Sequence, residues 1–401
     1  MTRDEPGGAC VRCALAAAGV LVFFSGLDNY AFGYWSGPRP VYLVLSFLAV
    51  SIALALYDVH APLRALWSPL MVWTAFYFVL STLWAVWMRN SPVVMEAWHA
   101  RYRSVGFLVA FAFIFEDPRA RRMGALAAAA AVVLASCLNV LELFGILEFQ
   151  KPEDLSGIGR AAGFFVNPNA AGIAIAFGVG AAISSVPRKW RIPLITVGAV
   201  GIAATFSRGA ELCYALLILY LVWRREVPLW PIALACLAVA VIFSAHSVDL
   251  LNTLSRHDAL NEETMARLSF HGGDSGRSAL AVKAWRMFLD APLLGKGLGA
   301  TIDWEDTINS SHNQFLNLAG DHGILGLVAF PALGLALFLA NRSSTGFALA
   351  LMAAGAFSHN LLDDRAILLT ISLAASRDAL PLDTRVHEPP ATLLDEAQGQ
   401  S

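Results

Sequence analysis

Ser311-His312-Asn313-Gln314 stands at the start of a long apolar run that continues through Gly323-Ile324-Leu325-Gly326. Two polar, glycine-containing motifs precede it, Asp274-Ser275-Gly276-Arg277 and Gly295-Lys296-Gly297-Leu298-Gly299. A cationic, histidine-bearing segment held against the end of an apolar helix is costly to place, because its polar groups lose contact with water. We therefore expect residues 274–326 to carry the function of the chain, as part of a loop that covers a reaction site at a membrane surface.

The composition indicates an integral membrane protein. Of the 401 residues, 57% are hydrophobic and only 14% are charged, whereas soluble domains carry roughly 25% charged residues. The mean hydropathy is +0.60. The net charge is -2 and the chain has no basic tail, so nothing predicts nucleic acid as a partner. The expected fold is an all-α polytopic membrane protein in contact with membrane lipids.

Apolar runs predict where the chain crosses the membrane. A span needs about 20 mostly apolar residues, and twelve stretches are candidates: 11–27, 41–57, 66–88, 104–116, 123–147, 169–186, 192–207, 210–223, 228–245, 313–340, 345–359 and 361–376. No internal repeat divides them. We expect a single membrane domain, residues 1–401, with its spans between about 11 and 376.

Basic residues at the ends of these runs predict the orientation. They cluster after even-numbered runs, for example at 119–122 and 188–191, and such clusters mark the cytoplasmic side. Both termini, including a tail at 377–401, are therefore expected in the cytoplasm. The longest connection, residues 246–312 between the ninth and tenth runs, then lies on the opposite side, where it would form a subdomain that caps the active site.

Arg208 lies in a tight turn, Phe206-Ser207-Arg208-Gly209, between two apolar runs. An arginine within a membrane span costs about 2.5 kcal/mol or more, and it is usually paired or close to water. One interpretation is a structural arginine that reaches lipid phosphate or pairs with Glu211. The other is a fork of N–H donors that binds a pyrophosphate at the membrane surface.

Arg277 follows a candidate N-cap, Asp274 or Ser275, and is expected in the first turn of a helix. Apolar residues at helical spacing between Leu280 and Leu289 would give this helix one apolar face. That face would lie on the bilayer or on the helix bundle and direct Arg277 towards the site. The alternative is a solvated arginine on an amphipathic helix.

His312 is expected at the beginning of the tenth run, where Ser310 or Ser311 could cap the helix. The positive end of the helix dipole and the nearby arginines disfavour an imidazolium there. A neutral imidazole is what a general base needs, and a structural histidine is the alternative. Ser358-His359-Asn360 repeats the Ser-His-Asn triplet, and we interpret it as a structural or supporting cluster.

No motif predicts a metal or a cofactor. Cys10-Val11-Arg12-Cys13 has CxxC spacing but lacks a second pair. Residues 295–300 match G-x-G-x-x-A, but no strand precedes them, so a dinucleotide site is rejected. The chain has no H-E-x-x-H and no carboxylate cluster of the metal-ligand type. We predict neither a catalytic metal nor a cofactor.

At these positions the chain resembles the O-antigen ligase and polymerase superfamily. The likeness rests on four pieces in order: Arg160-Ala161-Ala162-Gly163 leading into Asn167-Pro168-Asn169; Ser207-Arg208-Gly209; Gly276-Arg277 with the glycine motif at 295–299; and His312-Asn313, nine residues, then Gly323-x-x-Gly326. The family's motif in the large loop often reads R-x-x-x-L, whereas Ala281 stands at that position here. Arg267 therefore remains an alternative to Arg277.

The resemblance implies a GT-C-like glycosyltransferase of the Gram-negative inner membrane with a large periplasmic loop. It would move a glycan from undecaprenyl pyrophosphate to the lipid A core, with inversion and without a metal. His312 would be the base, and Arg208, Arg277 and Arg160 would hold the pyrophosphate. Arg267, Asn313 and His359 would support them.

Three other functions stay open at this point. An O-antigen polymerase would use two lipid-linked glycans, and a protein O-oligosaccharyltransferase would use serine or threonine as the acceptor. A lipid or ion transporter could also have twelve spans. Transporter sites lie near the membrane midplane, whereas the charges here cluster at one face, which favours a transferase.

Overall fold

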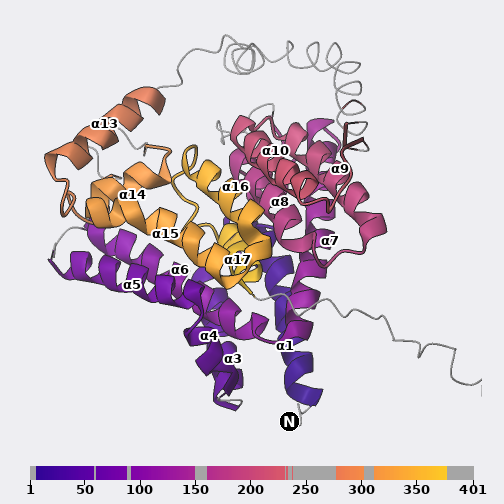
Figure 1. The fold of residues 1–401 in the computed structure, drawn as a ribbon, viewed down its shortest axis with the longest axis horizontal. Coiled ribbons are helices and arrows are strands. Elements are labelled where there is room, and N and C mark those ends of the chain that lie inside the picture. The colour runs from indigo at the N-terminus through magenta and orange to yellow at the C-terminus, as the bar shows by residue number, and fades with distance from the viewer. Residues whose placement is uncertain are drawn as a thin grey trace, which may run out of the picture.

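The computed structural model describes residues 6–57, 60–87, 92–149, 160–230, 232–233, 237, 277–301 and 311–376. Over these ranges the chain is helical and contains no strand (Figure 1). The helices are α1 (Pro6–Gly19), η1 (Val20–Phe24), α2 (Leu27–Tyr34), α3 (Pro40–Tyr57), α4 (His60–Leu66), α5 (Pro69–Trp87), α6 (Pro92–Phe115), α7 (Pro118–Leu143), η3 (Gly163–Phe165), α8 (Pro168–Ala182), α9 (Arg188–Ala204), α10 (Arg208–Trp223), α13 (Arg277–Asp290), α14 (Gln314–His322), α15 (Ile324–Ala340), η5 (Arg342–Ser344), α16 (Thr345–Gly355) and α17 (Arg365–Ala375).

Prolines and capping side chains set where many of these helices begin. α3, α5, α6, α7 and α8 all start at a proline, a residue whose missing N–H costs nothing in the first turn. Asp117 caps α7 by accepting from the backbone N–H of Arg119 at 2.7 Å. Asn167 and Asp364 cap α8 and α17 in the same way. Local sequence therefore fixes most helix starts.

Three described helices, α3, α5 and α7, are long and apolar enough to cross a membrane. The bent pair Gly8–Phe24 and Leu27–Tyr34 can count as a fourth span. Other predicted spans correspond to shorter helices, such as α8 with 15 residues and α17 with 11. At 1.5 Å per residue these are about 22 and 16 Å long, less than the roughly 30 Å of a bilayer core. The polytopic all-α class is confirmed, and the number twelve stays a prediction.

Two predicted boundaries are wrong. The predicted runs 66–88 and 104–116 leave a connection between them, but α6 already begins at Pro92 and carries Arg101 inside the bundle. The predicted helix 313–340 is divided at Gly323 into α14 and α15. Gly323 has a φ of 65°, and a Cβ there would lie 2.5 Å from the backbone carbonyl carbon of Leu293. The break between α14 and α15 lets the loop that contains Leu293 approach closely. Hydropathy alone could not predict this break.

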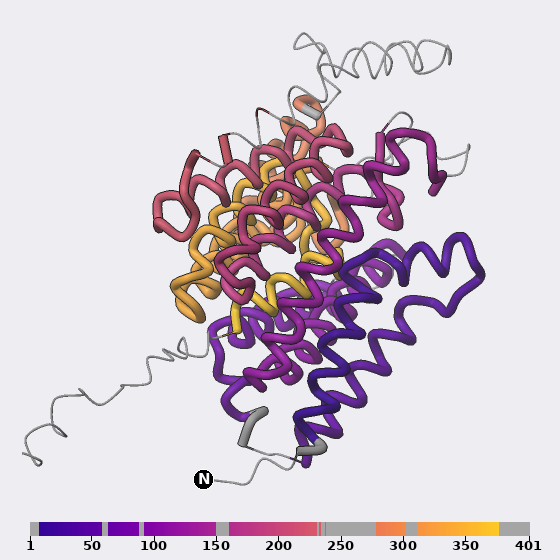
Figure 2. Tube along the Cα trace, turned by 90° about the vertical axis from the view of Figure 1, so that its right-hand side faces the viewer, coloured from indigo at the N-terminus to yellow at the C-terminus, as the bar shows by residue number. Residues whose placement is uncertain are grey.

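α17 lies at the centre of the bundle. All its residues from Ala366 to Ala375 are buried, and it contacts α6, α8 and α15. The tube view shows this yellow segment between the N-terminal helices and the magenta helices α8 to α10 (Figure 2). A helix that is apolar all round is buried on every side. The loop that leads into α17, residues 356–364, is therefore anchored in the core.

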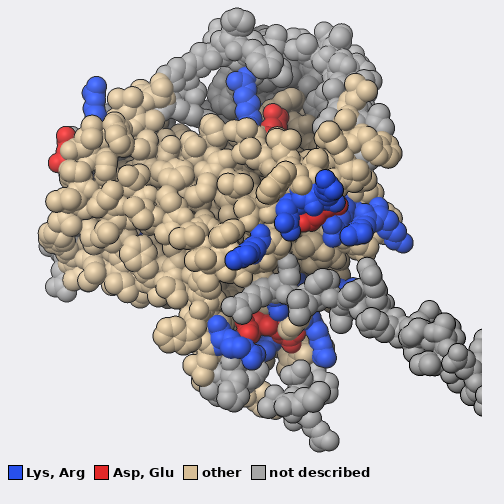
Figure 3. Space-filling view, viewed as in Figure 1, with Lys and Arg blue, Asp and Glu red and all other residues tan. Residues whose placement is uncertain are grey.

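Large apolar side chains cover much of the surface. They include Leu56 at 74% exposed, Trp67 at 81% and Leu83 at 58%. One face of the molecule has a broad area without charged side chains, and lysine and arginine gather at its edges (Figure 3). Exposed apolar area of this extent is rare on soluble monomers. The surface fits a lipid environment.

Candidate active site

The turn between α9 and α10 presents Arg208 at the start of a helix. α9 ends at Ala204 and α10 begins at Arg208, with Ser207 as the N-cap, so the predicted tight turn is confirmed. Phe206 has a φ of 49°, a left-handed conformation that few non-glycine residues adopt. Arg208 is exposed, and its charge interacts with Glu211 one turn further on. The guanidinium and the positive end of α10 both favour an anion here.

Arg160 contacts the same turn from inside the protein. It is 7% exposed, and its Nε donates to the Thr205 carbonyl at 2.9 Å. Its Nη2 donates to the Phe206 carbonyl at 3.4 Å and to Asn169 Oδ1 at 2.9 Å. Ser207 Oγ donates to the same Asn169 oxygen at 3.1 Å. Because carbonyls at a helix C-terminus have no partner within the helix, these bonds hold the Arg208 turn in shape.

His312 lies immediately before α14, as the sequence predicted. The N-cap is Asn313, not Ser310 or Ser311, and its Oδ1 accepts a backbone N–H of the first turn at 3.0 Å. Ser311 Oγ instead donates to Asn317 Oδ1 at 2.5 Å, and Ser310 lies outside the described residues. His312 has a φ of 50°. Such a strained residue persists only where its surroundings hold it in place, and the bonds of Ser311 and Asn313 do so on either side.

A second histidine faces His312 from the loop 356–364. The rings of His312 and His359 lie edge to face, with centroids 5.0 Å apart and an interplanar angle of 77°. Asn313 Nδ2 donates to the Ala356 carbonyl at 3.5 Å, which ties the two loops together. Burial lowers the pKa of His359 to about 4, and His312 acts in the same direction. His359 is therefore uncharged near neutral pH.

Arg208, His312 and His359 line one cavity of about 390 Å³. Polar side chains around it also include Asn167, Asn169, Ser207, Ser358, Asn360 and Asp364, and apolar ones include Ile173, Leu212 and Phe357. The cavity has a polar, cationic rim and an apolar wall, so it can accept a charged head group attached to a lipid. A larger cavity of about 610 Å³, between the start of α5 and the end of α17, contains none of the predicted site residues.

Four helices begin at the smaller cavity. Residues of the first turns of α8, α10 and α17 line it, together with His312 directly before α14. Each helix N-terminus carries roughly half a positive charge, but Asn167, Asn313 and Asp364 already accept N–H groups of α8, α14 and α17. α10 has no side-chain cap, so its first-turn N–H groups add to the charge of Arg208. The arrangement can bind an anionic group and stabilise negative charge that develops there.

α13, the helix that begins at Arg277, packs against α14 (Figure 1). Ala284 and Phe288 are buried, whereas Trp285 and Leu289 are 44% and 56% exposed. One part of the predicted apolar face therefore packs against the protein, and the other part is exposed. The side chain of Arg277 and the whole of Arg267 lie outside the part of the chain that the structure describes.

The loop after α13 is attached to the end of α14. All three glycines of the motif 295–299 have positive φ, of 73°, 113° and 81°. The backbone N–H of Lys296 donates to the Gly320 carbonyl at 2.8 Å, and that of Gly297 to the Asp321 carbonyl at 3.1 Å. A Cβ at Gly295 would lie 2.5 Å from the Asp321 carbonyl. The motif is thus a docking turn for the large loop.

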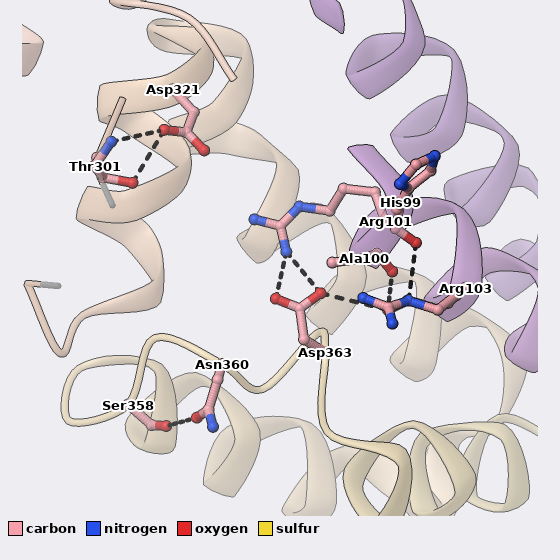
Figure 4. Close-up of polar contacts among 10 residues, drawn as sticks. His99, Ala100, Arg101, Arg103, Thr301, Asp321, Ser358, Asn360 and Asp363 are labelled. Carbon is pink, nitrogen blue, oxygen red and sulfur yellow. Dashed lines mark hydrogen bonds and ion pairs between the residues drawn. The ribbon is translucent and has the colours of Figure 1, made fainter. Parts of the chain in front are cut away.

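Asp321 holds the far end of this turn. Its Oδ1 accepts from the Thr301 backbone N–H at 3.2 Å and from Thr301 Oγ1 at 3.0 Å (Figure 4). Next to it, the buried ring of His322 packs against Trp84 with centroids 5.4 Å apart. These contacts fix α13 relative to the helix that starts beside His312. Asp321 was not predicted from the sequence, because an acidic residue inside an apolar run gives no local sign of its partner.

The structure thus brings Arg208, His312, His359 and Asn313 to one place, with Arg160 directly behind them. Among the described residues no group of three or more His, Cys, Asp or Glu is placed to hold a metal ion. The buried pair Arg101–Asp363 was also missed, and it lies next to the His359 loop.

One known protein family matches the part of the chain that carries Arg208 and His312. The family model described as O-antigen ligase matches residues 192–331, which run from α9 to the middle of α15. This segment is similar to the O-antigen ligase family. It covers about a third of the chain and contains Arg208, Arg277 and His312, whereas Arg160 and His359 lie outside it. A comparison with curated proteins gave no match.

Proposed function

We propose that this protein is a glycosyltransferase of O-antigen assembly that transfers a glycan from undecaprenyl pyrophosphate to a sugar hydroxyl. The observation that carries the proposal is that Arg208 and His312, far apart in sequence and both within the O-antigen ligase domain, line the same cavity. A pyrophosphate needs cations, and an attacking hydroxyl needs a base. Both are present within one pocket.

In the proposed reaction the acceptor hydroxyl attacks the anomeric carbon of the donor. A new C–O bond forms, and the bond from this carbon to the pyrophosphate oxygen breaks. His312 accepts the hydroxyl proton. Arg208 and the helix N-termini stabilise the charge that develops on the leaving pyrophosphate. Displacement in one step inverts the anomeric configuration.

The other arginines have separate parts in this proposal. Arg160 positions the Arg208 turn, because its guanidinium is engaged with the carbonyls of that turn. In this proposal Arg277, at the start of α13, binds the pyrophosphate from the predicted loop 246–312, and Arg267 remains the alternative to it. Since arginines and helix dipoles supply the positive charge, the proposed reaction requires no divalent metal ion.

We further propose that the acceptor is the lipid A core and that the reaction takes place at the periplasmic face of the inner membrane. The clustering of basic residues after even-numbered runs supports this orientation. The apolar wall of the cavity suits two lipid-borne substrates that arrive from the bilayer.

The decisive experiment reconstitutes the full-length protein in proteoliposomes with an undecaprenyl-pyrophosphate-linked glycan. Three acceptors are offered separately: lipid A core, a second lipid-linked glycan, and a serine-containing peptide. Transfer to lipid A core alone is expected. Transfer to the second glycan or to the peptide would identify a polymerase or a protein-modifying enzyme instead. Movement of the lipid-linked glycan across the bilayer without transfer would indicate a transporter and refute the proposal.

A further inference from the structure

A fully buried arginine lies behind the candidate active site. Arg101, on α6, is 4% exposed, and its Nη1 donates to both carboxylate oxygens of Asp363, at 2.8 and 2.6 Å (Figure 4). Its guanidinium also lies 5.8 Å from the centre of the Tyr77 ring. Taking the charge of Arg101 out of water costs several kcal/mol, and apolar side chains of similar volume often stabilise a fold as well or better. Stability alone is therefore a weak reason for this pair.

Asp363 connects the pair to the wall of the active-site cavity. It lies in the loop 356–364, where its backbone N–H donates to the Asn360 carbonyl at 3.0 Å. Ser104, one turn after Arg101 on α6, donates its hydroxyl to the Ala100 carbonyl at 3.0 Å, and the same Oγ lies 3.4 Å from Asp363 Oδ1. Residues 357–361 and Asp364 line the cavity. Arg101 thus fixes a loop whose other residues face the substrate pocket.

His359 is the residue of that loop that contacts His312. Its ring is partly buried, and its Nδ1 has no hydrogen-bond partner among the described residues. The position of the ring therefore depends on the loop backbone and not on a bond of its own. The charged and titratable groups around it come from several elements: His312 before α14, Arg208 on α10, Asp364 at the start of α17, Asp363 in its own loop and Arg101 on α6.

We infer that the Arg101–Asp363 ion pair is a positioning device for the catalytic base: it fixes the loop 356–364 so that the ring of His359 stays against His312. The inference rests on the proposed role of His312. Arg101 and Asp363 touch no substrate, and they act through His359.

The pair also has an electrostatic consequence. In the wild-type protein the Asp363 carboxylate raises the pKa of the neighbouring His359 and the Arg101 cation lowers it. Asp363→Asn leaves the Arg101 cation uncompensated, which disfavours the imidazolium of His312. Arg101→Gln leaves the Asp363 carboxylate uncompensated, and because its side chain is 33% exposed this carboxylate stays ionised and favours the imidazolium. A general base must be unprotonated to act, so its pKa sets the acid limb of the pH–rate profile.

The test measures kcat against pH for the full-length protein in proteoliposomes, with the lipid-linked glycan and lipid A core. We expect the acid limb of Asp363→Asn to move to lower pH and that of Arg101→Gln to higher pH, each by on the order of one pH unit. The double variant, Arg101→Gln with Asp363→Asn, restores charge balance and should return the limb to its original place. KM for the donor should change little in all three, while kcat falls.

A matched control is a second ion pair of the same region. Arg365 Nε donates to Asp28 Oδ2 at 2.5 Å, and Asp28→Asn breaks this bond at the start of α17 without removing a partner of Arg101. This variant should lower the melting temperature without moving the acid limb.

Two results would overturn the inference while leaving the proposed function intact: losses of activity that track melting temperature in every variant, or acid limbs of both single variants at the wild-type pH. Absence of transfer by the wild-type protein would instead refute the proposed function itself.

Discussion

Arg208→Lys is the most direct test of how the cavity holds its anion. The substitution keeps the positive charge but replaces a planar fork of donors with a single ammonium group. A hydrogen bond to a charged partner contributes about 1.5–3 kcal/mol, and each 1.36 kcal/mol in the barrier is a factor of ten in rate. Losing one of two such bonds predicts a fall in kcat of about 10- to 150-fold.

The environment of Arg208 places the expected value near the lower end of that range. The side chain is exposed at the mouth of the cavity, where water weakens its interaction with an anion. We therefore expect about a 10- to 30-fold lower kcat for Arg208→Lys. Arg208→Ala removes the donors and the charge, and it should cost about 100- to 1,000-fold, as loss of a transition-state donor does in other enzymes.

The assay follows glycan transfer to lipid A core in proteoliposomes at saturating donor. Arg224→Lys is the matched control, because Arg224 is an exposed arginine at the opposite end of the same helix. It should keep wild-type kcat. If kcat of both Arg208→Lys and Arg208→Ala stays within threefold of the wild-type value, Arg208 is a structural or lipid-binding residue.

Three further predictions concern the base, the loop and the metal. His312→Ala should abolish transfer while the amount of folded protein, followed by size-exclusion fluorescence, stays unchanged; residual transfer at more than a tenth of the wild-type rate would remove the base assignment. Gly295→Ala should lower the melting temperature and activity more than Gly145→Ala, since both glycines have positive φ but only a Cβ at Gly295 meets backbone, 2.5 Å away; equal effects would contradict the docking role. Transfer should persist in excess EDTA, and a loss that magnesium restores would replace the proposed arginine-based mechanism.

Local features of the sequence were enough to predict where Arg208 and His312 lie relative to the helices. The Arg208 turn was visible because two apolar runs stop and restart within four residues, and a helix must begin there. The position of His312 followed from the polar residues that precede α14. Such signals lie within one or two turns of a helix, where side chains act on their own backbone.

Contacts between distant segments could not be predicted in this way. Arg101 and Asp363 are separated by 262 positions, and no pattern in either segment names the other as a partner. The same holds for Gly323, whose positive φ serves the approach of Leu293 from another loop. Counting apolar runs also cannot tell a full membrane span from a short buried helix, because burial inside a bundle and burial in lipid demand the same side chains.

Helix N-termini are suited to binding an anion at a membrane surface, for a physical reason. Each N-terminus stabilises a nearby anion by about 0.3–1 kcal/mol at an exposed site, and by up to about 2 kcal/mol where it is partly buried. Three of the four at the cavity are capped by Asn167, Asn313 and Asp364, so the N-terminus of α10, which has no side-chain cap, contributes most beside Arg208. A backbone dipole carries no net charge, so it avoids most of the desolvation cost that further arginines would incur beside lipid. It is also fixed by the fold, so it needs no rearrangement as the leaving pyrophosphate gains charge. Fewer arginines are then needed at this site, and the strained turn at Phe206 is the cost of aiming the start of α10 at the cavity.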